Sequence, residues 1–488
     1  MKLLEINLSP ISDRRFQAIT GSSPVGDGQA ESDLPFWDGD RDRLATVTKL
    51  LELCGGFDPK IFPSDQEQAW MTQAQLLLDQ GISPTYLETI GQALYQALLP
   101  VGSSLRTVFN DALHQATEPG EPLHLRLRIA PEVAQRSRLA DYPWELLHDG
   151  QRFLSLHRQL VVSRYLAYEA RPPAVDRHTS LKVLLVSSTA GDPALRLPPL
   201  PSLEPQAIRD GLANAANISL DQLPQATRRA LRTYDGQPQV VHFDGHGLYG
   251  QRCVNPDCQR MHNSLSLSQC KSCDQPLPEP EGFLLLADDQ GRPDYVSAQE
   301  FALLLPSSVV LVVLSACQSA MAMVGTSLFR GVAQRLIDTR VPAVVAMQYS
   351  VLADAASQFA EQFYRELAKG KSLVATLQSA RRAMVDIPNQ WYRPALYLRW
   401  RDDDGGQLFK DVEQAAEPIG LRRSQRLDLK RLKEVLEDLA EDYGAIRARL
   451  RTELDPVTER KLKRKLKQIS DEMDSCEQEM SELQRRDG

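Results

Sequence analysis

A histidine and a cysteine each follow a short apolar run, and this pair of residue types could perform nucleophilic catalysis. His246 follows the run that begins at Val240, and Cys317 ends the run that begins at Val309. Aliphatic and β-branched runs of this length predict buried strands, and ligands bind at the carboxyl edge of parallel strands. An imidazole there can take the thiol proton, and the thiolate can then attack a carbonyl carbon. The sequence therefore predicts a catalytic dyad of His246 and Cys317.

Gly247, directly after the histidine, adds to this chemistry. Because glycine has no side chain, its backbone N–H can approach a substrate closely. Together with the N–H of Cys317, it could hold the oxyanion of a tetrahedral intermediate. Taken alone, His246 is also typical of a hydrogen-bonded core histidine, and Cys317 of a packed thiol. Their occurrence at the ends of two apolar runs favours the catalytic interpretation.

A second group of reactive residues comes shortly after the histidine. Cys253 and Cys258 form one pair of thiols, and Cys270 and Cys273 form another after eleven residues. Two such pairs are typical of a structural, tetrahedral Zn²⁺ site, and four thiolates leave no open position for a zinc-dependent hydrolase. His262 is a weaker fifth candidate ligand. The alternatives are iron in the same four-thiolate geometry and two reduced pairs in a loop without metal.

The motifs around the predicted dyad resemble those of the CHAT family, the caspase-related cysteine peptidases of bacteria. His-Phe-x-Gly-His-Gly is represented at 242–247 and Leu-Ser-Ala-Cys at 314–317. Three more family blocks occur in order, at Pro143–Leu147, Val341–Gln348 and Pro394–Arg399. The resemblance covers residues 86–400 and implies a caspase-like cysteine endopeptidase that cleaves protein substrates. Ser-Ala-Cys-Gln-Ser replaces the Gln-Ala-Cys-x-Gly of caspases proper, which argues against an aspartate-specific activity.

The same resemblance implies roles for three further residues. In the related metacaspases the residue at the place of Asp244 contributes to the primary specificity pocket. A carboxylate there would favour Lys or Arg before the scissile bond. The alternative is a turn-forming Asp244 that bonds to nearby backbone. For Trp144 and Glu145 the resemblance implies a structural role, in which they pack the first lobe of the fold against the second.

The spacing between the two predicted catalytic residues is longer than usual. His246 and Cys317 are 71 positions apart, whereas about 50 positions separate these residues in caspases. Setting aside residues 251–280 leaves 41 positions. We therefore interpret 251–280 as a zinc knuckle inserted at the rim of the active site, where it would shape substrate access or dock a partner. Metal would have to supply the folding energy of this insert.

Strand and helix patterns alternate through the part of the chain that carries these residues. Strands are expected at 182–188, 239–243, 283–287, 309–314 and 343–347. With helices between them, they predict an α/β fold, a caspase-like and mostly parallel sheet flanked by helices. Residues 123–129 also alternate, and their cations predict a solvated face. Residues 21–34, rich in Gly, Ser, Asp and Pro, predict a loop.

Five segments are expected along the chain. They are an N-terminal hairpin and helical segment (1–85), an N-terminal lobe (86–178), a catalytic lobe (179–402), a linker (403–425) and a helical hairpin or coiled coil (426–488). Apolar residues step by four and three through the last segment, which predicts a heptad seam on two helices. Because a two-helix hairpin is marginal alone, we expect it to pair with itself, with the body of the protein or with another protein. By analogy with short helical adaptors at the ends of bacterial conflict-system proteins, we expect that partner to be a sensor or adaptor protein.

Composition limits the function further. The net charge of −8 argues against a nucleic-acid binder, and no apolar run reaches the length of a membrane span. An odd number of cysteines, seven, and an N-terminus without a signal-peptide pattern favour a cytoplasmic protein. We expect regulated proteolysis, in bacterial defence or programmed cell death. The alternative is a catalytically silent caspase-like adaptor that assembles a complex through the zinc knuckle and the hairpin.

Overall fold

The structure, a computed structural model, describes most of the chain up to residue 410 and a few residues beyond it. The described residues are 2–53, 64–79, 81–116, 122–130, 138–167, 175–195, 197–201, 203–223, 225–262, 267–317, 328–339, 341–400, 405–410, 462, 463, 465, 467 and 469. The chain divides into two compact units, Met1–Phe409 and Lys410–Gly488. The predicted hairpin lies almost wholly outside the described residues. Within the described part, no helix has the length and apolar character that a membrane span requires.

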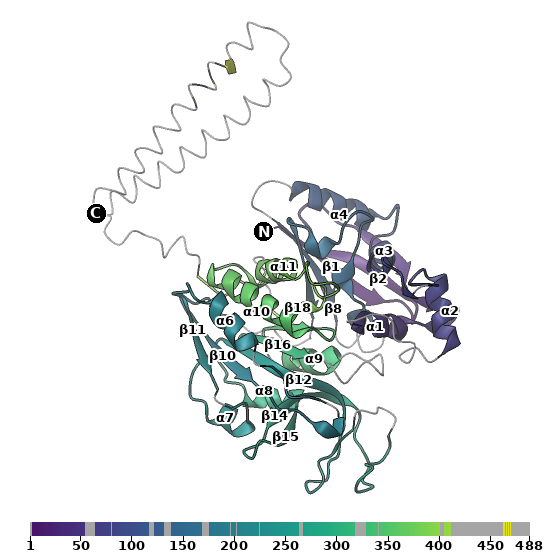
Figure 1. The fold of residues 1–488 in the computed structure, drawn as a ribbon. Coiled ribbons are helices and arrows are strands. Elements are labelled where there is room, and N and C mark those ends of the chain that lie inside the picture. The colour runs from purple at the N-terminus through teal and green to yellow at the C-terminus, as the bar shows by residue number, and fades with distance from the viewer. Residues whose placement is uncertain are drawn as a thin grey trace, which may run out of the picture. The chain divides into compact units, whose positions relative to one another are not determined.

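One sheet of fourteen strands organises the first unit (Figure 1). Its strand order is β11 (Ile218–Gln222), β10 (Leu181–Ser187), β12 (Val240–Arg252), β16 (Leu311–Cys317), β17 (Ala343–Met347), β18 (Pro394–Leu398), β9 (Leu160–Leu166), β8 (Leu123–Ile129), β1 (Lys2–Pro10), β2 (Arg15–Ser22) and β3 (Gln29–Asp33). The neighbours from β11 to β17 are parallel, whereas β18 runs antiparallel to β17. The predicted α/β fold with a mostly parallel sheet is confirmed.

Three further strands leave this path at β12. They are β13 (Met261–His262), β14 (Glu281–Ala287) and β15 (Pro293–Ser297). Both β13 and β14 pair antiparallel with the second half of β12, and β15 pairs antiparallel with β14. These strands therefore form a small antiparallel extension that begins where β12 leaves the parallel sheet.

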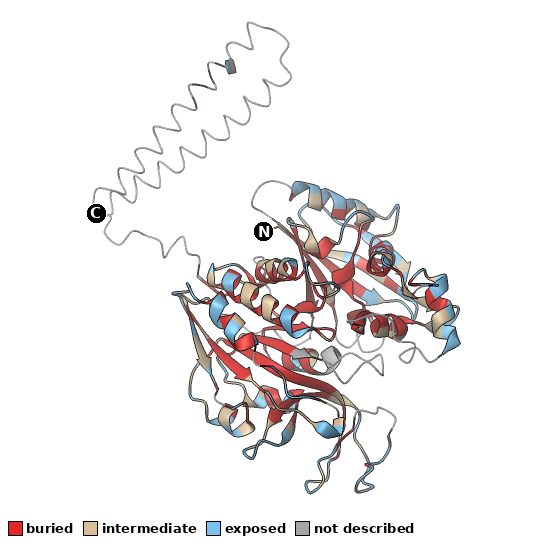
Figure 2. Ribbon diagram, viewed as in Figure 1, coloured by how far each residue is buried: buried red, intermediate tan, exposed pale blue. Residues whose placement is uncertain are grey.

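Helices cover both faces of the parallel part of the sheet. They are α6 (Glu204–Gly211), α10 (Ala353–Ala368) and α11 (Leu373–Ala383) on one side, and α7 (Arg228–Thr233), α8 (Ala298–Leu304) and α9 (Leu328–Asp338) on the other (Figure 1). Successive side chains of β12 point to opposite faces of the sheet. His242 contacts Tyr364 of α10 on one face, and Phe243 contacts Phe301 of α8 on the other. The strands between the helices are buried, which follows from apolar side chains on both faces (Figure 2).

The N-terminal part adds its own elements around β1, β2 and β3. They are the helices α1 (Leu44–Glu52), α2 (Asp65–Gln73), α3 (Tyr86–Leu98) and α4 (Ser104–Gln115), and the short strand pairs β4 (Trp37–Asp38) with β5 (Arg41–Asp42) and β6 (Leu77–Leu78) with β7 (Gly81–Ile82). The prediction of a loop over 21–34 is wrong at both ends, since β2 extends to Ser22 and β3 pairs with β2.

The prediction of a solvated cationic face on β8 is also wrong. His124 is buried with its Nε2 2.7 Å from the hydroxyl of Ser163 on β9, and Arg126 is buried with its Nε 2.9 Å from a carboxylate oxygen of Glu5 on β1. The strand lies between two neighbours that each supply a polar partner, so its polar side chains need no solvent. Burial lowers the pKa of His124 to about 3, so this imidazole is neutral at pH 7.

Trp144 and Glu145 are both buried, as a structural role requires, and the expected contact between the two lobes is confirmed for Glu145. Trp144 is fully buried and donates from its Nε1 to the carbonyl of Leu139 at 2.8 Å. The carboxylate of Glu145 accepts from Arg164 Nε at 3.0 Å and from Gln348 Nε2 at 2.7 Å. Arg164 lies on β9 and Gln348 directly follows β17, so this buried network joins the two sides of the β18–β9 junction.

Candidate active site and metal centre

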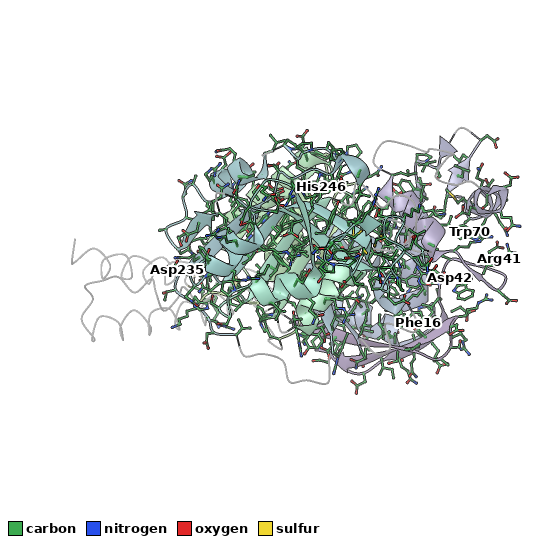
Figure 3. The ribbon with its side chains drawn as sticks, turned by 90° about the horizontal axis from the view of Figure 1, so that it is seen from below. Phe16, Arg41, Asp42, Trp70, Asp235 and His246 are labelled. Atoms are coloured by element: carbon green, nitrogen blue, oxygen red, sulfur yellow. The ribbon has the colours of Figure 1, made fainter. Side chains whose placement is uncertain are left out.

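The parallel pairing of β12 with β16 brings the two predicted catalytic residues together. Seven residue pairs form this register, from Val240 opposite Leu311 to His246 opposite Cys317. The expectation that these two residues meet on neighbouring parallel strands therefore holds for the backbone. Figure 3 shows that His246 lies away from Asp235. Asp235 precedes the amino end of β12, and His246 lies where the parallel pairing of β12 ends. The side chain of Cys317 lies outside the described residues.

The imidazole of His246 is held by a backbone carbonyl that the sequence did not indicate. Its Nε2 lies 2.7 Å from the carbonyl oxygen of Pro198, and the residue is only 1 % exposed. A carbonyl can only accept, so Nε2 carries the hydrogen and Nδ1 is the basic nitrogen of the neutral ring. Burial lowers the pKa of His246, although the Pro198 carbonyl opposes this effect. His246 is therefore a neutral base at pH 7.

The sequence predicts a strand that ends before His246, but β12 continues past this residue. Its first part pairs with β10 and β16, and its second part continues through Arg252, with Gly247 opposite Leu284 of β14. His246 is thus the last residue of β12 in the parallel sheet, and Gly247 is the first in the antiparallel extension. Gly245 is required at its position, because a Cβ there would lie 2.5 Å from the Phe243 ring.

Asp244 lies one layer below His246, in a row of polar residues across three strands. The register places Ser187 of β10 and Ser315 of β16 on either side of it. The Ser187 hydroxyl donates to the Asp244 carboxylate at 2.9 Å. The Ser315 hydroxyl is buried and has no hydrogen-bond partner among the described residues. Asp244 is therefore part of a strand and of a side-chain network, rather than of a turn.

A second buried network lies next to Asp244 on the same face of β12. His242 contacts a carboxylate oxygen of Glu204 on α6 through Nε2 at 3.1 Å, and the hydroxyl of Tyr364 on α10 through Nδ1 at 3.0 Å. Burial raises the pKa of Asp244 to about 7, and the neighbouring carboxylate of Glu204 contributes to that rise. The alternation of β12 indicates that His242, Asp244 and His246 share a face, but it does not identify these partners.

A cavity of about 660 Å³ borders this row on the β10 side. Its lining includes Ser187, Ser188 and Thr189, together with Leu197 and Pro199 from the loop that holds His246. Ser188 is buried, and within the described part of the chain its hydroxyl has no hydrogen-bond partner. Neither Asp244 nor His246 lines the cavity, although the loop that holds His246 does.

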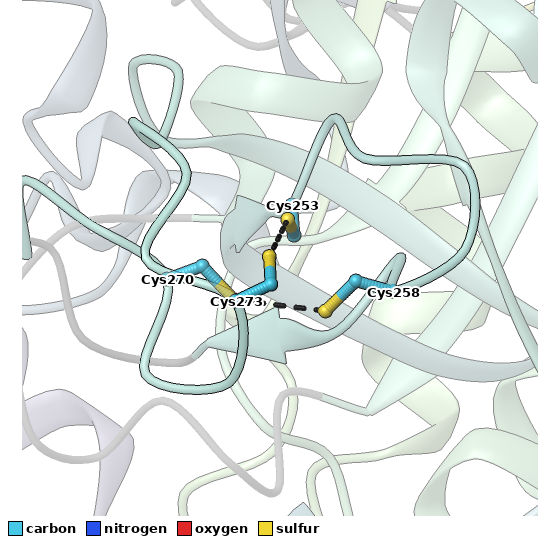
Figure 4. A group of neighbouring side chains, drawn as sticks. All are labelled: Cys253, Cys258, Cys270 and Cys273. Carbon is cyan, nitrogen blue, oxygen red and sulfur yellow. Dashed lines mark hydrogen bonds between the residues drawn. The ribbon is translucent and has the colours of Figure 1, made fainter.

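The four cysteines of the predicted knuckle converge (Figure 4). The sulfurs of Cys253 and Cys273 are 3.4 Å apart, those of Cys258 and Cys270 are 3.7 Å apart, and all four lie within 4.8 Å of one another. A disulfide would need about 2.05 Å. Four sulfurs at about 2.3 Å from one Zn²⁺ would stand about 3.8 Å apart in a tetrahedron. The donor set and its spacing therefore fit a four-coordinate structural metal ion.

The backbone and a neighbouring histidine complete this metal centre. Gln259 and Asp274, which directly follow the second cysteine of each pair, have left-handed φ angles of 45° and 56° that turn the chain around the sulfurs. His262 lies with its Nε2 3.3 Å from the sulfur of Cys270, and the Ser272 N–H donates to the same sulfur at 3.4 Å. His262 thus fits a hydrogen-bond donor to a ligand better than a fifth ligand.

We expect the purified protein to contain one Zn²⁺ per chain, measured by elemental analysis. Cys258→Ser should lose most of this metal, because three thiolates bind it more weakly, and should unfold at a lower temperature. Cys317→Ala, which leaves the four-cysteine group intact, serves as the matched control and should keep its zinc. Iron in place of zinc would be recognised by visible absorption. Unchanged metal content in Cys258→Ser would contradict the assignment.

Comparison with solved structures finds only distant similarities. A chain of the separase–securin complex of Saccharomyces cerevisiae aligns with a TM-score of 0.34 and 10 % identity, over 81 % of this chain and 30 % of the other. The Arg-specific cysteine proteinase gingipain R aligns with a TM-score of 0.36 and 12 % identity, over 72 % and 76 %. The chain spans less than a third of the separase structure's chain. No curated protein matches it.

Comparison with family models assigns both parts of the chain. The model described as Effector-associated domain 9 matches residues 422–483. The model of the CHAT domain matches residues 88–403, which is well over half of the chain and contains every residue of the predicted active site and metal centre. The chain therefore belongs to the CHAT domain family of caspase-related proteins.

Proposed function

We propose that this protein is a cysteine endopeptidase with Cys317 as nucleophile and His246 as general base and acid. The register that pairs His246 with Cys317, at the edge of a sheet in a CHAT domain, is the observation that carries this proposal. Nδ1 of His246 takes the thiol proton, and the Cys317 thiolate attacks the scissile carbonyl carbon. The protonated imidazole then gives its proton to the leaving amine, and water hydrolyses the thioester.

Backbone amides complete the proposed reaction. The N–H groups of Gly247 and Cys317 would donate to the oxyanion of the tetrahedral intermediate. The hydrogen bond from His246 Nε2 to Pro198 fixes the ring in the tautomer that the first proton transfer needs. The four thiolates of Cys253, Cys258, Cys270 and Cys273 would hold a structural Zn²⁺ that takes no part in bond cleavage.

Asp244 is proposed to select a basic residue before the scissile bond. The proposal is supported by its carboxylate one layer below His246 and by the buried Ser315 hydroxyl beside it. Because the pKa of Asp244 is raised to about 7, the carboxylate becomes charged as the pH rises through that value. A charged carboxylate attracts Lys or Arg, so the preference for basic residues should strengthen with pH.

This proposal predicts how the ratio of kcat/KM for a Lys substrate to that for its norleucine analogue depends on pH. In the wild type the ratio should rise about tenfold or more between pH 6 and pH 8, because only the charged carboxylate favours lysine. In Asp244→Asn the ratio should be low and independent of pH. Titration of His246 and Cys317 changes kcat/KM for both substrates equally, so it cancels in the ratio. A preference for apolar or acidic residues would refute the assignment of Asp244.

The setting that we propose is regulated proteolysis in bacterial defence or cell death. The match of residues 422–483 to an effector-associated domain supports a regulatory partner, such as a sensor, that is bound through the C-terminal segment. Cleavage of protein substrates would then depend on that partner. A peptidase regulated in this way and a catalytically silent adaptor would bind the same partner, and they differ only in whether Cys317 reacts with a substrate.

Labelling by peptidyl electrophiles tests the proposed function directly. Purified protein would be treated with a panel of such reagents that differ in the residue before the reactive group, and adducts would be read from the intact mass. We expect one adduct on the wild type, fastest with Lys or Arg reagents, and none on Cys317→Ala. The absence of any adduct from folded, metal-loaded protein, both alone and with its partner, would favour the adaptor.

A further inference from the structure

The loop between β10 and α6 determines how the imidazole of His246 is oriented. Its residue Pro198 supplies the carbonyl that accepts from Nε2 at 2.7 Å. The side chain of Pro198 is exposed, so it does not itself anchor the loop. Leu197, directly before it, is only 2 % exposed and is the most buried of the three described loop residues, with Ala190 and Leu195, that pack against a small apolar cluster. The position of the catalytic histidine therefore depends on what holds Leu197.

Leu197 belongs to a small apolar cluster that is separate from the main core. We call it the docking cluster, and its members are Leu197, Leu248, Met261, Phe283, Leu285 and Tyr295. Apart from Leu197, all of them lie on β12, β13, β14 and β15, the antiparallel extension beyond His246. The loop thus packs against the extension rather than against the parallel sheet below it.

Polar contacts fasten the loop to the same extension. The Tyr295 hydroxyl donates to the Asp192 carboxylate at 2.8 Å. The backbones of Asp192 and Leu197 exchange two hydrogen bonds of 2.9 Å, which close the loop between them. The other Asp192 oxygen accepts from the Ala194 N–H at 2.8 Å. Asp192 therefore ties the closed loop to β15 with one carboxylate.

The metal centre is linked to the docking cluster through Met261. Met261 lies on β13, which pairs with β12 at Arg252, directly before the ligand Cys253. Strands β12 and β13 are in close contact, since a Cβ on Gly250 would lie 2.3 Å from the carbonyl oxygen of His262. His262 in turn contacts the sulfur of Cys270. The four-cysteine group thus fixes the short strand that carries Met261.

We propose that Asp192, Leu197 and Tyr295 are positioning residues for His246, and that the four-cysteine metal centre supports them through Met261. The inference rests on the proposed function and deepens it, because it gives the insert a role in catalysis as well as at the rim. When the docking cluster loosens, the Pro198 carbonyl moves away from Nε2, and the ring loses its fixed tautomer and direction. A misplacement of about 1 Å can cost roughly 100-fold in rate.

The test uses the full chain and compares variants of the loop with a control. Leu197→Ala and Tyr295→Phe should lower kcat for a short peptide about 10- to 100-fold and leave KM nearly unchanged, as expected when an orienting contact is lost. Asp192→Asn, which keeps one of the two oxygen acceptors, should lose less activity than Asp192→Ala, which should resemble Tyr295→Phe. Leu303→Ala, at an exposed residue of α8, is the matched control.

A spectroscopic measurement separates this inference from the proposed function. The side-chain nitrogen resonances of His246, assigned by their loss in His246→Gln, report its tautomer whether or not the protein turns over substrate. We expect them to shift in Leu197→Ala, in Tyr295→Phe and after removal of metal by a chelator, but not in Leu303→Ala. Unchanged His246 resonances in all three cases would overturn the inference, as would a chelator effect confined to protein substrates. A lack of turnover by the wild type would instead count against the proposed function alone.

Discussion

Replacing His246 by alanine is expected to lower kcat/KM for a peptide substrate by about 10²- to 10⁴-fold, the range for loss of a general acid–base group. Cys317→Ala should lose turnover entirely, because no other nucleophile is proposed at this edge. The reason for the first effect is specific to this ring. Its low pKa and its Nε2 bond to Pro198 make Nδ1 the base at neutral pH. Steady-state kinetics with a fluorogenic peptide measure both losses.

The pH profile of His246→Ala gives a second measure of the same role. Alkylation of Cys317 by iodoacetamide should be fast at neutral pH in the wild type, because the imidazole withdraws the thiol proton. In His246→Ala the rate should follow the ionisation of an ordinary thiol, at about pH 8.5. His114→Ala, at an exposed histidine of α4, is the control and should behave as the wild type. Equal profiles for His246→Ala and the wild type would rule out His246 as the base.

The second large effect is expected on stability. Glu145→Ala should lower the free energy of unfolding by about 3–5 kcal/mol, the usual cost of leaving a buried charge without its partner. Burial alone would raise the pKa of Glu145. The guanidinium of the fully buried Arg164 outweighs this effect and holds the pKa of Glu145 below its ordinary value. Glu145 is therefore ionised at pH 7, and its removal leaves the Arg164 guanidinium uncompensated. Urea unfolding followed by tryptophan fluorescence measures the change.

A surface pair provides the control for this experiment. Glu361 and Arg365 form an ion pair along α10 with side chains 36 % and 44 % exposed. Glu361→Ala should cost less than about 1 kcal/mol, because solvent screens such pairs. A similar small loss in Glu145→Ala would mean that the buried network does not hold the two sides of the β18–β9 junction together.

Much of the fold could be predicted because its strands are short apolar runs separated by helical patterns. The runs ending at His246 and Cys317 do form neighbouring parallel strands. The errors have a common physical origin. Residues 21–34 contain the edge strand β3, and only its pairing with β2 makes that polar stretch a strand. The cations of β8 alternate as a solvated face would, but Glu5 and Ser163 on the neighbouring strands make their burial possible.

For the candidate site, the sequence by itself determined the candidate groups: a thiol and an imidazole that each follow an apolar run, four cysteines in two close pairs, and a carboxylate two residues before the histidine. Residue type and local spacing are enough for such predictions, because periodicity and ligand preference act over a few residues. Only the tertiary structure decided which groups meet those side chains. Pro198 is 48 residues from His246, and Glu204 is 38 residues from His242. Their contacts depend on how separate loops and helices pack over the sheet, and a local pattern of polar and apolar residues does not specify that packing.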